Sequence, residues 1–194
     1  MIDSLTLKEI CSKYDIDYEK LIKSNANILD YGDYNEICEI LEFLKNEVNI
    51  QAKNIEKCPS ILYYIGTENI KANWNFLMEQ KITISNIETC LHILNTEPNE
   101  LKRTYNYIQN NYGVEYLNEQ TSILKVTVDR IQEIERCFKD FNKKTILQAA
   151  CSRFSIDELR DIVEVCKENG IEPTGSVFKR TAEEIEKIVE VCNA

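Results

Sequence analysis

The chain has 194 residues, 43% of them hydrophobic, and a formal net charge of −10 at pH 7. An acidic surface repels phosphate backbones, so nonspecific binding to nucleic acid or to an anionic membrane is disfavoured unless basic residues cluster locally. Only 5 Gly and 3 Pro are present, and this scarcity of breakers favours helices over sheets with tight turns. No apolar run approaches the roughly 20 residues that span a bilayer, so we expect an all-α protein without a membrane partner.

Capping residues mark where the helices are expected to begin. In a capping box, a side-chain oxygen and a glutamate three residues later satisfy free backbone N–H groups. Thr67, Thr96 and Thr127 are further candidate caps that lack the glutamate. The five candidate boxes, including one that starts with Asp, are Thr6–Glu9, Asp33–Glu36, Ser85–Glu88, Ser155–Glu158 and Thr181–Glu184.

Apolar residues three to four positions apart follow these starts and predict alternating long and short amphipathic helices. The long helices are expected at 6–14, 33–47, 67–80, 97–111, 127–141, 155–169 and 181–193. The short ones are expected at 17–24, 50–57, 85–91, 114–121 and 143–151, with a turn near 174–179.

A short apolar segment recurs between the short and long helices. It reads ANIL, PSIL, LHIL and TSIL, and its successive Ile–Leu pairs are 33, 32 and 30 residues apart. Helix pairs with this period bury their apolar stripes only by stacking, so we predict one helical-repeat domain over residues 1–194. It would be a right- or left-curved solenoid of about five to six helix-pair repeats of about 30 residues. The expected turns lie near 26–29, 59–62, 91–94 and 121–124, with weaker copies at 152–154 and 176–178.

The segment Cys58-Pro59-Ser60-Ile61-Leu62, set between a short and a longer helix, resembles the repeat of the mitochondrial transcription termination factor (mTERF) family. The resemblance is strongest over 50–94 and continues in phase over 17–192. It implies paired helices plus a short 3₁₀ turn, stacked into a curved superhelix that binds nucleic acid along a basic concave face. This chain is acidic and poor in arginine, and its N-terminal segment reads as neither a secretory signal nor an organelle-targeting leader.

The cysteines and the single histidine offer little sign of catalysis. Eight cysteines occur about once per repeat, and Cys58 and Cys90 share one repeat position, which predicts reduced core thiols in the cytoplasm. His92 stands where other copies of the turn have serine, which predicts a polar turn position rather than a base or zinc ligand. Because the sequence also lacks nucleotide-binding and nucleophile motifs, we expect no enzymatic activity, cofactor or metal.

A set of basic residues in the later repeats is the candidate contact surface for phosphates. For Lys139, Lys143 and Lys144 the alternative is a position at a helix C-terminus, where a base complements the helix dipole. Tyr63 and Tyr64 lie in a turn, where they can stack on bases, anchor a protein partner or cap the core edge. The basic candidates are Arg136, Lys139, Lys143, Lys144, Arg153, Arg160, Lys179 and Arg180.

The N-terminal segment 6–24 also loosely resembles a helix-turn-helix, with Lys20 and Lys23 on its second helix. Its phase equally matches the end of one repeat and the start of the next. Together, these features predict a non-enzymatic scaffold that binds a protein partner along one face. A basic partner, such as a nucleic-acid-handling protein, would complement the acidic chain; DNA or RNA is the alternative that the family resemblance implies.

Overall fold

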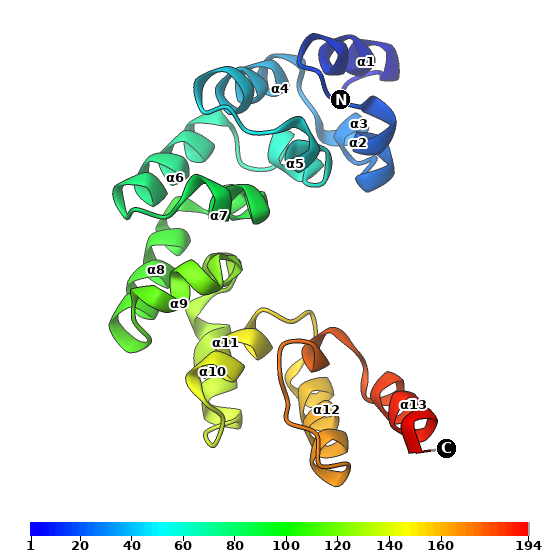
Figure 1. Cartoon of the computed structure of the whole chain (residues 1–194). Coiled ribbons are helices and arrows are strands. Elements are labelled where there is room, and N and C mark those ends of the chain that lie inside the picture. Colours follow the sequence, from blue (N-terminus) through cyan, green and yellow to red (C-terminus); the bar gives the residue numbers. More distant parts are fainter. Residues whose placement is uncertain (194) are drawn as a thin grey trace. The chain divides into compact units, whose positions relative to one another are not determined.

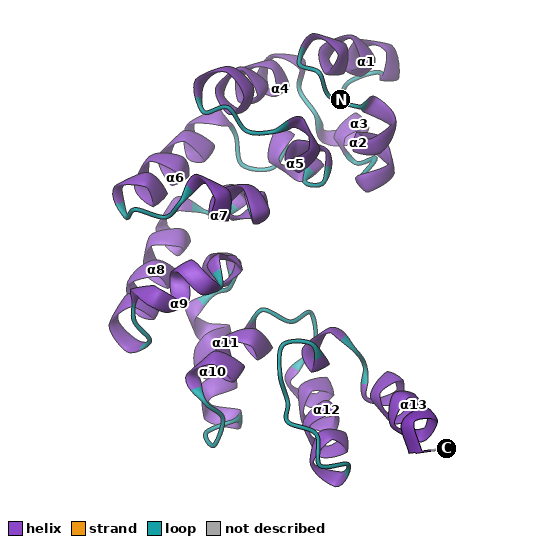
Figure 2. Cartoon of the chain, viewed as in Figure 1, coloured by secondary structure: helices purple, strands orange, loops and turns teal. Residues whose placement is uncertain are grey.

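The computed structural model describes residues 1–193, and within that range it contains helices and loops but no strand (Figure 2). The prediction of an all-α protein is therefore confirmed. No helix among the described residues is long and apolar enough to cross a membrane. Contacts divide the chain into two compact units, Met1–Lys125 (unit 1) and Val126–Ala194 (unit 2), and each is described by itself.

In unit 1 the longer helices follow one another along one side and the short helices α5, α7 and α9 along the other (Figure 1). The six residues after α4 continue as π-helix, η1. The elements are α1 (Ser4–Lys13), α2 (Tyr18–Ser24), α3 (Ile28–Tyr31), α4 (Tyr34–Leu41), η1 (Glu42–Glu47), α5 (Ala52–Glu56), η2 (Pro59–Leu62), α6 (Thr67–Glu79), α7 (Ile84–Thr89), η3 (Leu91–Asn95), α8 (Pro98–Asn111), α9 (Val114–Glu119) and η4 (Thr121–Lys125).

Three of the four predicted Ile–Leu segments form the 3₁₀ turns η2, η3 and η4, which contact one another in that order. The first differs, because Ile28 and Leu29 begin the short α-helix α3. The Ile–Leu side chains of the three turns are completely buried, as at Ile61 and Leu62, and burying each contributes about 1.5–3 kcal/mol. The side chain of Asn73, on α6, donates from Nδ2 to the Leu94 and Thr96 carbonyls, 3.0 and 2.6 Å away. Apolar burial and this amide thus hold η3 against α6.

Several predicted helix starts are confirmed and others are wrong. Ser155–Glu158 is a capping box, and Asp33 and Thr127 cap their helices. The box at Thr6–Glu9 is wrong because α1 begins at Ser4, where the carboxylate of Asp3 accepts from the Leu5 and Thr6 amides. Similarly, Thr83 rather than Ser85 caps α7, and Glu88 accepts a hydrogen bond from the Gln51 amide instead.

Two of the threonine caps are also wrong. The N-cap of α6 is Gly66, at φ +78°, so Thr67 becomes the first residue of that helix. The N-cap of α8 is Glu97 instead of Thr96, because Pro98 suits the first helical position. Thr181 and Glu184 exchange the two hydrogen bonds of a capping box, as predicted.

Unit 2 pairs its helices, with α10 packed on α11 and α12 on α13. The expected turn at 152–154 is not helical, although Phe154 is buried there. α10 ends earlier than predicted, and Phe138 and Phe141 stack beyond it with ring centroids 5.2 Å apart. The elements are α10 (Val128–Cys137), α11 (Lys143–Ala150), α12 (Ile156–Glu168), η5 (Val177–Lys179) and α13 (Ala182–Asn193).

Candidate interaction site

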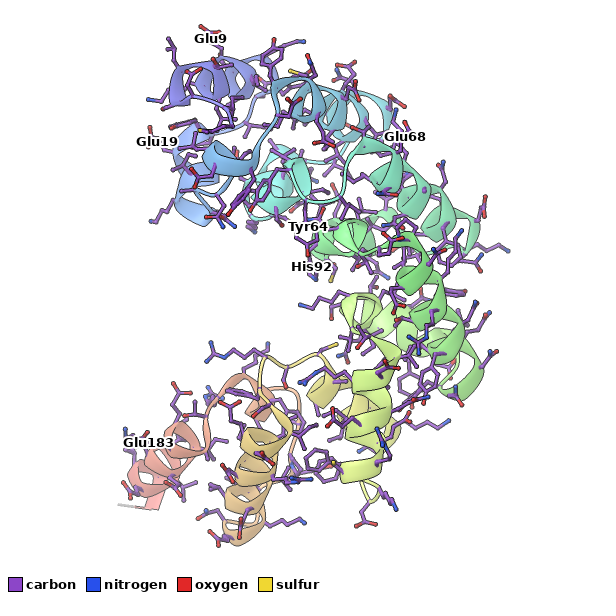
Figure 3. All side chains as sticks on the ribbon, turned by 180° about the vertical axis from the view of Figure 1, so that it is seen from behind. Glu9, Glu19, Tyr64, Glu68, His92 and Glu183 are labelled. Atoms are coloured by element: carbon purple, nitrogen blue, oxygen red, sulfur yellow. The ribbon has the colours of Figure 1, made fainter. Side chains whose placement is uncertain are left out.

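Three tyrosines of unit 1 form what we call the tyrosine cluster: Tyr31, at the end of α3, and Tyr63 and Tyr64, directly after η2. Tyr31 and Tyr64 are each 69% exposed. The rings of Tyr31 and Tyr63 stack with centroids 6.2 Å apart and an interplanar angle of 22°. Asn25 Nδ2 donates to the Tyr63 hydroxyl at 3.1 Å, and burial raises the pKa of that phenol. The structure therefore separates the two predicted tyrosines: Tyr63 is held in place, whereas Tyr64 projects from the edge where His92 also lies (Figure 3).

A positively charged groove, the lysine groove, lies between α2 and α5 in unit 1 and has a volume of about 380 Å³. Lys20 pairs with Asp17 at 3.0 Å, and the buried Glu56 accepts a hydrogen bond from the Asp17 amide. Among the described residues the other three lysines have no ion pair, so the groove is locally basic on an acidic chain. Its lining consists of Lys20, Lys23, Ser24, Lys53, Glu56 and Lys57.

Sequence reasoning noticed Lys20 and Lys23 only as part of a helix-turn-helix. The signal that would have found the groove is the repeat period, because Lys53 follows Lys20 by 33 residues and falls on the next short helix. Contacts between α2 and α5 place these two helices side by side. Residues about 30 positions apart in the sequence therefore form one surface where two short helices pack together.

An acidic groove lies between the starts of α4 and α6. Asp33 caps α4, accepting from the Asn35 and Glu36 amides at 3.0 and 3.1 Å. The carboxylate of Glu36 reaches the start of α6, where a Cβ on Gly66 would lie 2.9 Å from its Oε1. The lining consists of Asp33, Asn35, Glu36, Glu39, Ile65, Gly66, Thr67 and Glu68. In Figure 3 Glu68 lies apart from Tyr64 and His92, so this groove is separate from the tyrosine cluster.

His92 is half-buried in η3. Burial is the main cause that lowers its pKa, and the nearby Lys125 lowers it further, so the imidazole is neutral at pH 7. Its Nε2 is buried without a hydrogen-bond partner among the described residues. No group of three or more His, Cys, Asp or Glu residues within 1–193 is placed to hold a metal ion.

All eight cysteines are free thiols. Cys11 and Cys166 are buried as predicted, but Cys192 is exposed and the others are half-buried. Burial raises the pKa of Cys11 to about 11 and also raises the pKa of Cys58 and Cys166. A raised pKa keeps a thiol protonated at neutral pH, so these three groups are poor nucleophiles.

The basic residues predicted as contacts in unit 2 are all exposed, but they come from several elements. Arg136 donates to the Gln132 carbonyl of its own helix, α10, at 3.2 Å. Lys139 lies beyond the end of α10. The helix C-terminus explanation is wrong for Lys143 and Lys144, because they are the first two residues of α11, where a base opposes the helix dipole.

The remaining predicted residues lie around α12 and η5. Arg153 lies over the Phe154 ring, 5.2 Å from its centroid. Arg160 pairs with Asp157 at 2.7 Å and donates to Cys137 Sγ at 3.5 Å. Lys179 ends η5 and Arg180 follows it. Arg160 also borders a groove of about 560 Å³ that Phe138, Phe141 and Lys167 line.

Sequence reasoning also missed Arg130, on α10. Its guanidinium donates to the carbonyls of Ala150, Ser152 and Phe154 at 3.0, 3.2 and 2.7 Å. These bonds fix the loop between α11 and α12, so Arg130 is structural and is not available to phosphates. No pattern in the sequence distinguishes it from the exposed arginines.

Comparisons of this chain with protein-family models, with curated proteins and with solved structures find no significant match. The functional argument therefore rests on the tyrosine cluster and on the two oppositely charged grooves of unit 1.

Proposed function

We propose that this chain is a non-enzymatic, mTERF-like helical-repeat scaffold that binds a protein partner through unit 1. The repeat architecture is supported by the recurring order of short helix, 3₁₀ turn and long helix from α5 to η4. Support also comes from the contacts between successive turns. Stacked repeats of this kind offer an extended surface suited to a helix or an extended segment of a partner.

The observation that carries the proposal is the tyrosine cluster. Tyr31 and Tyr64 are each 69% exposed, whereas Tyr63, which stacks on Tyr31 and directly precedes Tyr64, is half-buried. Tyrosine is enriched at protein interfaces because its ring supplies a large contact area and its hydroxyl a hydrogen bond. The stacking of Tyr31 on Tyr63 at 6.2 Å orders one ring in advance, which lowers the entropy cost of binding.

Charge favours a partner with a basic segment. The acidic groove contributes four carboxylates on unit 1, and the whole chain carries −10. A basic protein, such as one that handles nucleic acid, would be steered towards this chain at low salt. The free thiols agree with a reducing compartment such as the cytoplasm.

Capture of partners from a host lysate tests the proposal. We expect the double variant Tyr31→Ala/Tyr64→Ala to lose the captured protein, because the exposed rings are removed while Tyr63 remains. Leu5→Ala is the matched control, since Leu5 is also 69% exposed but lies on α1, outside the cluster. Equal capture by both variants and the unchanged chain would contradict the proposal.

The lysine groove supports nucleic-acid binding as a second candidate function. Lys23, Lys53 and Lys57 are free to contact phosphates, and phosphate-driven affinity falls steeply as salt rises. The measurement is a salt titration with a mixed pool of labelled DNA and RNA oligonucleotides. Lys23→Gln/Lys53→Gln/Lys57→Gln should reduce both the affinity and the salt slope, whereas Lys102→Gln on α8 should not. Arg136→Gln and Arg153→Gln test the residues of unit 2 in the same assay.

A further inference from the structure

We propose that the acidic groove binds an arginine side chain of a protein partner. This inference rests on the proposed function, because it requires that the partner be a protein. It names the chemical group that the groove recognises, on a surface separate from the tyrosine cluster. The first part of the evidence is charge. Glu36, Glu39 and Glu68 line the groove with Asp33, and none of these four carboxylates has an ion pair among the described residues.

The second part of the evidence is Thr67. Its side chain lines the groove, is 6% exposed, and carries an Oγ1 without a hydrogen-bond partner in the described part of the chain. Buried polar atoms in folded proteins are nearly always paired, so an unpaired hydroxyl requires an explanation. Thr67 loses the usual role of a helix cap because Gly66 occupies that position. A donor supplied by a ligand would satisfy the hydroxyl.

The lining of the groove favours a cation with several hydrogen-bond donors. Gly66 keeps the wall open, because its backbone has φ +78° and a Cβ there would lie 2.9 Å from Glu36 Oε1. A guanidinium presents five N–H donors in one plane and can bond to more than one of the lining carboxylates, whereas an ammonium is a point charge. A metal ion is less suited, since no three carboxylates within residues 1–193 converge closely enough to hold one.

Binding of defined peptides to the ¹⁵N-labelled full chain tests the inference. The probe is an acetylated, amidated hexapeptide of glycine and serine with one central arginine, at low salt. We expect shifts at the amides of Glu36, Gly66, Thr67 and Glu68, with a Kd of about 1 mM, as is typical of a single charged contact. A peptide with citrulline or lysine in place of arginine should bind at least about tenfold more weakly, because citrulline lacks the charge and lysine lacks the planar donors.

Variants of the groove sharpen the test. Glu36→Gln/Glu68→Gln should weaken the arginine peptide about tenfold, as expected when a charge-assisted hydrogen bond is lost. Thr67→Val should weaken it a few-fold without unfolding the chain, because valine keeps the shape and removes an unpaired hydroxyl. Glu9→Gln, an exposed carboxylate on α1, is the control and should leave the affinity unchanged.

The inference would be overturned if the citrulline or the lysine peptide bound as tightly as the arginine peptide. It would also be overturned if Glu36→Gln/Glu68→Gln bound the arginine peptide as tightly as the unchanged chain. Displacement of the peptide by equimolar Mg²⁺ or Ca²⁺ would also overturn it, in favour of a metal site. If the arginine peptide fails to bind while Tyr31→Ala/Tyr64→Ala abolishes partner capture, the inference is wrong and the proposed function stands. If the peptide binds as expected while those tyrosine variants capture normally, the inference holds and the tyrosine surface is wrong.

Discussion

Replacing Arg130 is expected to destabilise unit 2 far more than replacing any exposed arginine. The guanidinium of Arg130 donates to three carbonyls in the segment from Ala150 to Phe154, at 2.7–3.2 Å. Arg130→Met removes all three bonds and retains most of the aliphatic stem, so the loss of packing is small. Arg136→Met is the matched control on the same helix, because Arg136 is exposed and, within residues 1–193, its hydrogen bond goes to the Gln132 carbonyl of its own helix.

The expected magnitude follows from the number of bonds and their burial. A hydrogen bond from a charged donor contributes about 1.5–3 kcal/mol, and leaving a buried carbonyl unpaired adds to the cost of removal. Because Arg130 is half-buried, water replaces part of what is lost. We therefore expect Arg130→Met to lower the free energy of unfolding by about 2–3 kcal/mol. Arg136→Met should change it by less than about 0.5 kcal/mol, as surface substitutions usually do.

Amide hydrogen exchange is the most direct assay, because it reports opening of the segment itself. The amides of Cys151 and Ser152 bond to the Leu147 and Ala149 carbonyls, so both are protected in the native chain. A loss of about 2 kcal/mol corresponds to roughly thirtyfold faster exchange when the segment closes much faster than its amides exchange. Urea unfolding followed by circular dichroism gives the overall change. Equal effects of Arg130→Met and Arg136→Met in both measurements would refute the structural role of Arg130.

Three further changes test unit 1. Asn73→Ala removes two hydrogen bonds to the Leu94 and Thr96 carbonyls and should lower the free energy of unfolding by about 2–4 kcal/mol. Urea unfolding followed by the fluorescence of the adjacent Trp74 measures this change, and a loss below about 1 kcal/mol would contradict the prediction. Thr67→Val removes a hydroxyl that has no hydrogen-bond partner among the described residues, so Tm should stay constant or rise. A clear fall in Tm would show that the hydroxyl is satisfied. The pKa of His92 is lowered in the folded chain, so the unfolded chain binds more protons and stability falls as pH drops below about 6.5. His92→Ser, which copies Ser60 and Ser122, should reduce the fall in unfolding midpoint between pH 7 and 5.5; an unchanged fall would assign it to other groups.

The sequence predicted the parts of the fold that depend on local patterns. The Ile–Leu pairs are buried at Ile61, Ile93 and Ile123, because burial removes their apolar surface from water. Capping failed where two candidates compete within a few residues. Asp3 precedes Thr6, and Thr83 precedes Ser85, and in each case the earlier oxygen caps the helix. At α6, glycine with positive φ displaced the threonine, a choice that depends on the path of the preceding turn.

The candidate surfaces were harder to predict because they depend on contacts between segments that are far apart in the sequence. Tyr63 and Tyr64 are adjacent in sequence, and the contacts of Tyr63 with Asn25 and Tyr31, more than 30 residues earlier, determine which ring is held. Arg130 and Arg136 look equivalent in the sequence, yet one is tied to three carbonyls and the other is exposed. Thr67 could not have been identified as unpaired without the position of Gly66. In each case the deciding atom lies outside the local segment.

Net charge describes the chain as a whole but not the surface that a partner meets. At physiological ionic strength the Debye length is about 8 Å, so exposed charges farther away than this contribute little at a given groove. The lysine groove is therefore attractive to anions on a chain whose formal charge is −10, and the acidic groove is more repulsive to them than that average suggests. Long-range attraction of a basic partner depends on the total charge, whereas its final orientation depends on which groove it enters. The neutralising variants of the two grooves change the net charge in opposite directions, so they separate long-range attraction from docking. The association rate of a basic partner should follow the sign of the change in net charge. The final affinity should fall only for the groove at which the partner docks.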